Sequence, residues 1–225
     1  GIVDFPVDFP LPPDHDDQWK WFKDESVLIH ALRLIAEAID AKYQTIVADT
    51  IKPHQGQHMA AQIKGDSRMR NKALAPEDHR HEPRPRPALN IDINRCCAIF
   101  DSPGDLEAAA RALCKRFGGA AGRVKNGFAL DKKEAGKSFH YRSLMLNLVY
   151  KVEDTTYGDI AMKHGAKWER DAEFLTQNPE VPWELWQAHQ KTAVSYLKGA
   201  AIARSPVTMV VEVQLLLKPY LAAGK

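Results

Sequence analysis

The sequence lacks any apolar run of about 18 residues, which a membrane-crossing helix needs, so we expect no transmembrane segment. Cysteine is scarce: Cys96, Cys97 and Cys114 show no CxxC spacing, which favours reduced, buried thiols over a zinc site or a disulfide framework. Neither positive nor negative residues are in large excess, because the formal net charge of the 225 residues is +2. So small a charge does not by itself indicate a nucleic-acid or membrane partner. No secretory leader is visible, although Gly1 also fits a start exposed by cleavage.

The composition suits one soluble globular domain, since 44% of the residues are apolar and 27% are charged. Residues 1–18 carry four prolines, so we expect residues 1–23 to form an extended arm. Residues 24–225 are expected to form a single domain. Within it, residues 151–206 form a long insertion before the last core strand.

Hydrophobic periodicity predicts a mixed α/β or α+β domain, with a sheet of about four or five strands flanked by helices. The helices are expected at residues 24–43, at 69–74 with Ser67 as N-cap, at 106–117 behind Ser102, and at 183–203. The Gly118-Gly119 pair should end the third of these helices. Extended segments are expected at residues 62–64, 89–100, 122–130, 140–150 and 207–221.

Two carboxylates interrupt apolar strand patterns. Asp92 is flanked by Ile91 and Ile93, and Glu212 lies inside VVEVQLLL. Burying a carboxylate in such a strand is costly unless it is paired or bound to a metal. Carboxylates on adjacent strands are a usual way to hold Mg²⁺, which prefers oxygen ligands and substrate phosphates. The alternative is that each acid faces water from an edge strand.

Basic residues lie around these acids. Lys64 lies at the N-terminal edge of the predicted second helix, and Arg68 and Lys72 share one face of it; free backbone N–H groups and the helix dipole there favour a polyphosphate. Arg70 is a further cation of this segment. A solvated basic face is the alternative. Tyr141 is suited to stacking on a base. Residue types alone therefore favour Mg-dependent phosphoryl or nucleotidyl transfer, with further cations at Arg123, Lys125, Lys137 and Arg142.

Five segments carry a resemblance to a known family when they are taken in order. They are QIKGDSRMRNK with Lys64 and Lys72, DINRCCAIF with Asp92 and Arg95, RVKNGF with Arg123 and Lys125, KSFHYRSLM with Lys137, Tyr141, Arg142 and Ser143, and VEVQLLL with Glu212 and Gln214. Together they resemble the synthetase domain of the RelA/SpoT family of alarmone synthetases. The resemblance covers roughly residues 45–150 and 207–221.

This resemblance implies a nucleotidyltransferase-like fold and transfer of the pyrophosphate of ATP to the 3′-hydroxyl of a purine nucleotide. The implied acceptor is GDP or GTP, giving (p)ppGpp, or an adenine nucleotide. Mg²⁺ is the implied cofactor, and the implied site of action is the cytoplasm, for a resident enzyme or a delivered toxin. The implied roles are catalysis and metal binding by Asp92 and Glu212, ATP binding by Lys64, Arg70, Lys72 and Arg95, and acceptor binding by Tyr141, Lys125, Lys137, Arg142 and Gln214.

The sequence also departs from the family pattern. Gln62 stands where arginine is usual, His140 replaces a glycine, Met145 a histidine and Leu216 an arginine. With neither a hydrolase domain nor regulatory domains, the chain resembles a small or toxin-type member. An antitoxin or immunity protein is then an expected partner, whereas a membrane or DNA is not. Pyrophosphorylation of a tRNA 3′ end and a degenerate nucleotide-binding module are the alternative functions.

The insertion carries Trp168, Trp183 and Trp186. Such aromatic residues anchor a partner or a lid in some proteins. More often they pack into a small local core, which we expect here.

Overall fold

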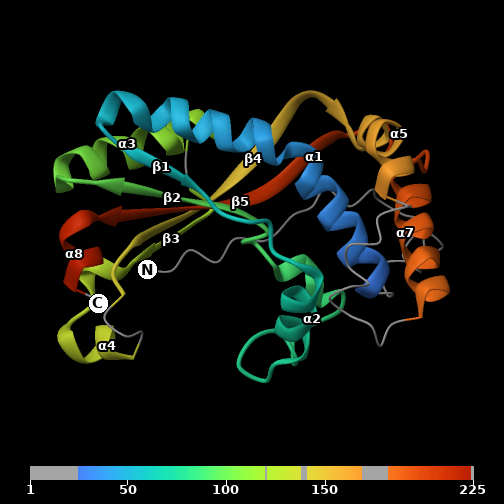
Figure 1. Cartoon of the computed structure of the whole chain (residues 1–225), viewed down its shortest axis with the longest axis horizontal. Coiled ribbons are helices and arrows are strands. Elements are labelled where there is room, and N and C mark those ends of the chain that lie inside the picture. The colour runs from blue at the N-terminus through green and yellow to red at the C-terminus, as the bar shows by residue number, and fades with distance from the viewer. Residues whose placement is uncertain (1–24, 120, 138–140, 169–181, 224–225) are drawn as a thin grey trace.

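Five strands form one mixed sheet in the order β1-β2-β5-β4-β3, with helices on its flanks (Figure 1). This arrangement confirms the α+β class and the five-stranded sheet expected from the sequence.

The computed structural model describes residues 25–119, 121–137, 141–168 and 182–223. The strands are β1 Gln57–Ala60, β2 Asn94–Phe100, β3 Arg123–Asn126, β4 Leu144–Thr156 and β5 Pro206–Leu217. The helices of this part of the chain are α1 Glu25–Ile51, α2 Asp66–Leu74, α3 Pro103–Arg116, α4 Lys132–Gly136, α5 Tyr157–Trp168, α7 Trp183–Leu197 and α8 Lys218–Ala223, with 3₁₀ turns η1 Lys52–His54, η2 Arg86–Leu89 and η3 Gly127–Ala129.

The long helix α1 supports one face of the sheet together with α3 (Figure 1). Ile39, Tyr43, Val47 and Ile51 recur at four-residue intervals along α1, and all four are almost fully buried. Because this apolar stripe continues past Tyr43, the helix runs to Ile51 instead of ending at the predicted residue 43.

Helix α3 confirms two predictions about its ends. The hydroxyl of Ser102 accepts the backbone N–H of Asp105 at 3.1 Å, which is the predicted N-cap. Gly118 and Gly119 have φ angles of 104° and 99°. This left-handed backbone suits glycine and ends the helix where the sequence indicated.

Alternation along the central strand β5 separates the core from a polar surface. Val211, Val213 and Leu215 are fully buried in the core under α1 and α3. Glu212 and Gln214 therefore point to the other side of the sheet. Residues directly opposite one another in the ladder share a side, so their register partners point the same way. We call this side the polar face; it includes Arg95, Cys97, Met145, Asn147, Glu212 and Gln214.

The loop before β2 differs from the expected strand. β2 begins at Asn94, so the prediction that Asp92 lies within a strand is wrong. The side-chain amide of Asn90 donates to the carbonyl of Pro87 at 3.1 Å and closes the η2 turn. The amide of Asn94 donates to Asp40 on α1 at 2.8 Å, which fixes where the strand starts. Asp92 therefore sits in a turn between these two anchors.

Three other strand boundaries also differ from the predictions. β3 is shorter than residues 122–130, because the η3 turn follows it directly. β4 starts at Leu144 and runs on to Thr156, past the predicted end at residue 150. β5 ends at Leu217, before the predicted residue 221, because helix α8 begins at the next residue. Pro219 lies in the first turn of α8, where its missing N–H group is tolerated.

The region around α2 was predicted incompletely. The expected extended piece at residues 62–64 is not a strand, and β1 pairs antiparallel with β2 a few residues earlier. The prediction of Ser67 as N-cap is wrong, because the cap is Gly65 and α2 begins at Asp66. Asp66 instead makes an ion pair with Arg70 at 2.6 Å.

The described part of the insertion forms the end of β4 and the helices α5 and α7, which pack on α1 (Figure 1). Trp168 is 4% exposed and Trp186 is 1% exposed, and both rings lie against His30 of α1, whereas Trp183 is half-buried. Trp168 joins the main core and not a separate local core, which differs from the prediction. Helix α7 ends at Leu197 and not at residue 203. The predicted arm at residues 1–23 and His140 lie outside the described residues.

None of the helices in the described ranges is both long enough and apolar enough to cross a bilayer.

The contact between α5 and α7 leads to a stability prediction. A Cβ atom at Gly165 would lie 2.8 Å from Cγ1 of Val194. We expect Gly165→Ala to lower the free energy of unfolding by about 1–3 kcal/mol, because overpacking outweighs the better helix propensity of alanine. Denaturant unfolding measures this change. Gly104→Ala in α3 is the control, since its Cβ would meet only Ser102 Oγ at 3.9 Å. A gain of stability in Gly165→Ala would contradict the packing.

Candidate functional site

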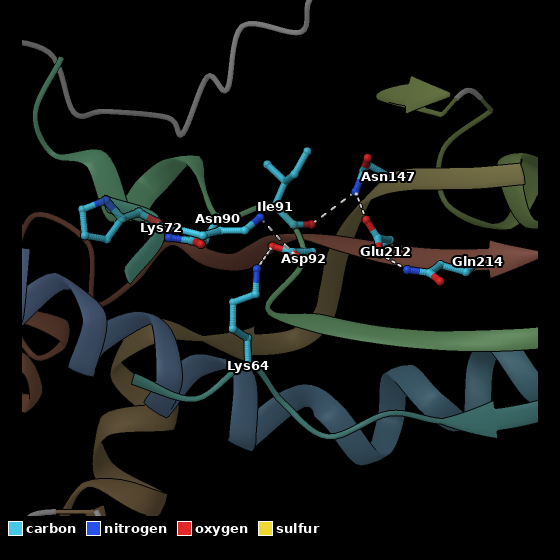
Figure 2. Close-up of polar contacts among 9 residues, drawn as sticks. Lys64, Lys72, Asn90, Ile91, Asp92, Asn147, Glu212 and Gln214 are labelled. Carbon is cyan, nitrogen blue, oxygen red and sulfur yellow. Dashed lines mark hydrogen bonds and ion pairs between the residues drawn. The ribbon is translucent and has the colours of Figure 1, made fainter. Parts of the chain in front are cut away.

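Asp92 lies between two lysines at one end of the polar face. Nζ of Lys64 makes an ion pair with Oδ1 of Asp92, and Nζ of Lys72 lies 3.6 Å from Oδ2. The side chain of Lys64 is fully buried, and that of Asp92 is 17% exposed. Figure 2 shows Lys64 reaching up to Asp92 from the chain below it. The structure thus brings together three residues that the sequence placed in one site.

Short backbone connections hold these residues in place. Lys64 lies in the segment between β1 and α2, and its N–H donates to the carbonyl of Ile93 at 3.0 Å. Lys72 lies in the last turn of α2. The two lysines therefore approach Asp92 from different segments, and the loop before β2 presents the acid to both.

Burial and charge act against each other in this cluster. Burial lowers the pKa of Lys64 to about 8, although the hydrogen bond and the charge of Asp92 oppose this shift. Burial alone would raise the pKa of Asp92. The hydrogen bond from Lys64 and the charges of Lys64 and Lys72 outweigh burial, so the pKa of Asp92 lies below its usual value. Both groups are therefore charged at neutral pH.

Glu212 lies nearly buried in the middle of β5, with 9% of its surface exposed. The side-chain amide of Gln214 donates to Oε1 at 2.7 Å, and the amide of Asn147 lies 3.4 Å from Oε2. From the helix side, the hydroxyl of Tyr43 donates to the backbone carbonyl of Glu212 at 2.7 Å. The carboxylate is thus held by two neutral donors, and no cation of the described residues lies within ion-pair distance of it.

Tyr141 extends this chain of hydrogen bonds toward solvent. Its hydroxyl donates to Oε1 of Gln214 at 2.9 Å, while 42% of the residue remains exposed. Partial burial raises the pKa of the Tyr141 phenol, so it keeps its proton at neutral pH. Both ends of the Gln214 amide are engaged, one by Tyr141 and the other by Glu212. Gln214 therefore orients Glu212, and its contact with an acceptor stays a prediction.

The two acids are linked through Asn147. Its side-chain amide lies 3.3 Å from the carbonyl of Ile91, the residue before Asp92, and 3.4 Å from Glu212. Figure 2 shows these dashed contacts as a bridge from the loop to β5. Asp92 and Glu212 therefore belong to one connected site.

The two predicted ATP-binding arginines are placed differently. Nε of Arg70 pairs with Asp66 at 2.6 Å, and its Nη1 donates to Ser26 at 2.9 Å, so its contacts lie within α2 and toward α1. The structure does not bring Arg70 into the Asp92 cluster. Arg95 lies opposite Glu212 in the ladder, half-buried, and its Nε has no hydrogen-bond partner among the described residues. Arg95 thus lies on the polar face with its Nε buried, and its contact with ATP stays a prediction.

The predicted acceptor-binding cations divide in a similar way. Nη1 of Arg142 is surrounded by the carbonyls of Gly127, Phe128 and Leu130, the closest at 2.7 Å, so this arginine secures the turn after β3. Lys125 on the edge strand β3 and Lys137 at the end of α4 are exposed. These two lysines remain free to meet the phosphates of a ligand.

Asp92 and Glu212 are the side chains of this site that could bind Mg²⁺. Asp92 and Glu212 supply carboxylate oxygens, which Mg²⁺ prefers. No group of three or more potential metal-binding side chains occurs among the described residues. Both oxygens of Asp92 already face lysines. The residues therefore fit an ion whose coordination is completed by substrate phosphates, provided that Lys72 moves from Asp92 to those phosphates.

Sequence reasoning missed Asn147 and the carbonyl of Ile91. Asn147 is 4% exposed in the middle of an apolar strand pattern, LMLNLVY, where asparagine is disfavoured. A polar residue within an apolar strand pattern is also what singled out Glu212, so the same pattern could have identified Asn147. Nothing in the sequence indicated the carbonyl of Ile91.

Comparisons with known proteins give one distant similarity. No protein-family model matches the chain, and no curated protein matches it. Among solved structures, the chain is similar to one from the crystal structure of the complex between the type VI effector Tas1 and its immunity protein. The identity is 17%, the TM-score is 0.38, and the match covers 79% of this chain and 94% of that chain. A similarity at this level assigns no reaction, substrate or partner here.

The buried ion pair leads to a pH-dependent prediction. Asp92→Asn leaves Lys64 buried without a counter-ion, so we expect a loss of roughly 2–4 kcal/mol in the free energy of unfolding at pH 6. The loss should shrink toward pH 9. The pKa of Lys64 is about 8, so above that pH the lysine is neutral and Asp92 stabilises it less. Urea unfolding at both pH values measures the difference.

Asp101→Asn is the matched control. Asp101 pairs with Lys218 at 3.2 Å, but both side chains are largely exposed, at 80% and 70%. Solvent screens such a pair, so its loss should be small at either pH. Equal losses at pH 6 and pH 9 for Asp92→Asn would contradict the account of the buried pair.

Proposed function

We propose that this protein is a Mg-dependent pyrophosphokinase that transfers the pyrophosphate of ATP to the 3′-hydroxyl of a purine nucleotide. The observation that carries the proposal is Glu212, a nearly buried carboxylate held by two amides and linked through Asn147 to the Lys64–Asp92–Lys72 cluster. A base and a phosphate-binding cluster on one sheet face are what this reaction requires. The sequence resemblance supplies the reaction type.

Lys72 and Glu212 take separate parts of the chemistry. Lys72, whose side chain is 33% exposed, neutralises charge on the phosphates of ATP, while the fully buried Lys64 holds Asp92 in place. Glu212 accepts the proton of the acceptor's 3′-hydroxyl, whose oxygen attacks the β-phosphorus in line. The bond from the β-phosphorus to the α-phosphate oxygen breaks, and AMP leaves. Asp92 and Glu212 would hold Mg²⁺, which would supply further charge neutralisation at the phosphates.

The acceptor is proposed to lie along the Tyr141 side of the polar face. The exposed ring of Tyr141 offers a stacking surface for a purine, and its hydroxyl is fixed by Gln214. Lys125 and Lys137 are the exposed cations that suit the acceptor phosphates. Guanine and adenine nucleotides both fit this description. An antitoxin or immunity protein stays a prediction.

A nucleotide-binding module without transferase activity is the second candidate. The observation in its favour is that both oxygens of Asp92 are engaged by lysines. If a bound triphosphate left these pairs intact, Asp92 could not hold a metal ion. Product formation separates the two candidates.

The first test is a product assay with a Glu212 variant. The protein is incubated with ATP, Mg²⁺ and, in turn, GDP, GTP, ADP, AMP or tRNA, and products are identified by mass. We expect AMP together with one acceptor heavier by a pyrophosphate group. Glu212→Gln should lower kcat by about 10²–10⁴-fold, since it removes the base, with little change in melting temperature.

Glu153→Gln, at an exposed glutamate of β4, is the matched control and should keep full activity. Full activity in Glu212→Gln would refute the mechanism. Binding of ATP without any product would favour the binding module.

A second prediction concerns the ring of Tyr141. Tyr141→Ala should raise the acceptor KM about tenfold or more, because stacking on a base contributes about 1–3 kcal/mol. Tyr141→Phe keeps the ring and should leave that KM nearly unchanged. Tyr220→Ala, at an exposed tyrosine of α8, is the control. If the alanine and phenylalanine variants of Tyr141 behaved alike, stacking would be excluded.

A further inference from the structure

Asn147 occupies a position where an asparagine needs an explanation. It is 4% exposed in the middle of β4, directly opposite Glu212 on β5. Asparagine is depleted in strands, and a buried amide is unfavourable without hydrogen-bond partners. The partners here are the carbonyl of Ile91 at 3.3 Å and Oε2 of Glu212 at 3.4 Å. Its side chain therefore serves two acceptors that belong to different segments.

The geometry of an amide makes such a bridge rigid. The NH₂ group carries two donors in one plane, so its two acceptors are held at a defined separation. One acceptor belongs to the residue before Asp92, and the other is the carboxylate of Glu212. Because Asn147 is itself fixed in a paired strand, it relates the position of one acid to that of the other.

The other contacts of Glu212 do not have this effect. Gln214 is two residues further along the same strand, so its hydrogen bond sets the side-chain orientation of Glu212 alone. Tyr43 binds the backbone carbonyl of Glu212 and ties β5 to α1. Lys64 and Lys72 contact Asp92 and not Glu212. Asn147 joins the two acids across the sheet.

We propose that Asn147 is a positioning residue that sets the separation between Asp92 and Glu212 for a shared divalent ion. This inference rests on the proposed function, in which both acids serve that ion. Asn147 itself touches neither substrate nor metal. Its removal should weaken metal binding and lower kcat, while the KM of the acceptor, which binds near Tyr141, stays unchanged.

Gln190 on α7 provides a control. It is also a buried side-chain amide, 1% exposed, and its NH₂ group donates to the carbonyl of Trp168 at the end of α5 at 2.8 Å. Neither residue belongs to the polar face or to the loop before β2. Loss of this amide should therefore lower stability without affecting the metal.

The test compares Asn147→Leu and Gln190→Leu in the full chain. Binding of Mn²⁺, as a probe for Mg²⁺, is measured by electron paramagnetic resonance with a non-hydrolysable ATP analogue present. The Mg²⁺ concentration for half-maximal activity is measured in parallel. We expect Asn147→Leu to weaken Mn²⁺ binding about 10-fold or more and to raise the Mg²⁺ requirement equally, as residues supporting metal ligands do elsewhere. Gln190→Leu should change neither.

Further outcomes keep the test decisive. If Asn147→Leu does not fold, Asn147→Thr replaces it; threonine has one donor for two acceptors, and the same weakening is expected. Unchanged Mn²⁺ binding in the folded variant, or equal weakening in Gln190→Leu, overturns the inference. If the wild-type protein yields no product with any acceptor, the proposed function fails, while Mn²⁺ binding still tests the role of Asn147.

Discussion

The ion pair between Lys64 and Asp92 is the interaction on which the site depends. A fully buried ammonium group needs a counter-charge, because desolvation would otherwise drive it to lose its proton. Asp92 supplies that charge from the loop before β2, and the backbone of Lys64 binds the same loop through Ile93. The pair therefore fixes the segment between β1 and α2 against the sheet. With that segment in place, α2 brings Lys72 to the same carboxylate.

The central position of β5 explains why Glu212 can join this cluster. β5 lies between β2 and β4, so its alternate residues are flanked by strands on both sides. One set of residues closes the core under α1 and α3, and the other set is half-enclosed on the polar face. A carboxylate there has little contact with water, so neighbouring amides must orient it. Gln214 and Asn147 do so, and Tyr141 extends the hydrogen bonds toward the surface.

The sequence predicted what depends on repeated local patterns. The apolar stripe of α1, the Ser102 cap and the VVEVQLLL strand all follow from spacing and capping. β1 was not predicted because QHMA shows no apolar alternation. Asp92 was placed in a strand because Ile91 and Ile93 on either side of it match the apolar alternation of a strand. The partners of Arg70 and Arg142 depend on tertiary contacts, which are absent from the local pattern. Lys64, Lys72, Asp92 and Glu212 were proposed together from a resemblance, and the structure connects them through Asn147, which that resemblance did not include.

The central claim is that the polar face, with Lys72 released from Asp92, is where a nucleotide and its metal bind. A crystal structure with Mn²⁺ and a non-hydrolysable ATP analogue, with the metal located by anomalous scattering, tests it most directly. We expect a Mn²⁺ peak between Asp92 and Glu212, phosphates against Lys72, and Nζ of Lys72 moved away from Oδ2 of Asp92. A nucleotide bound away from the polar face, or a bound triphosphate with Lys72 still paired to Asp92 and no metal peak, would refute this site.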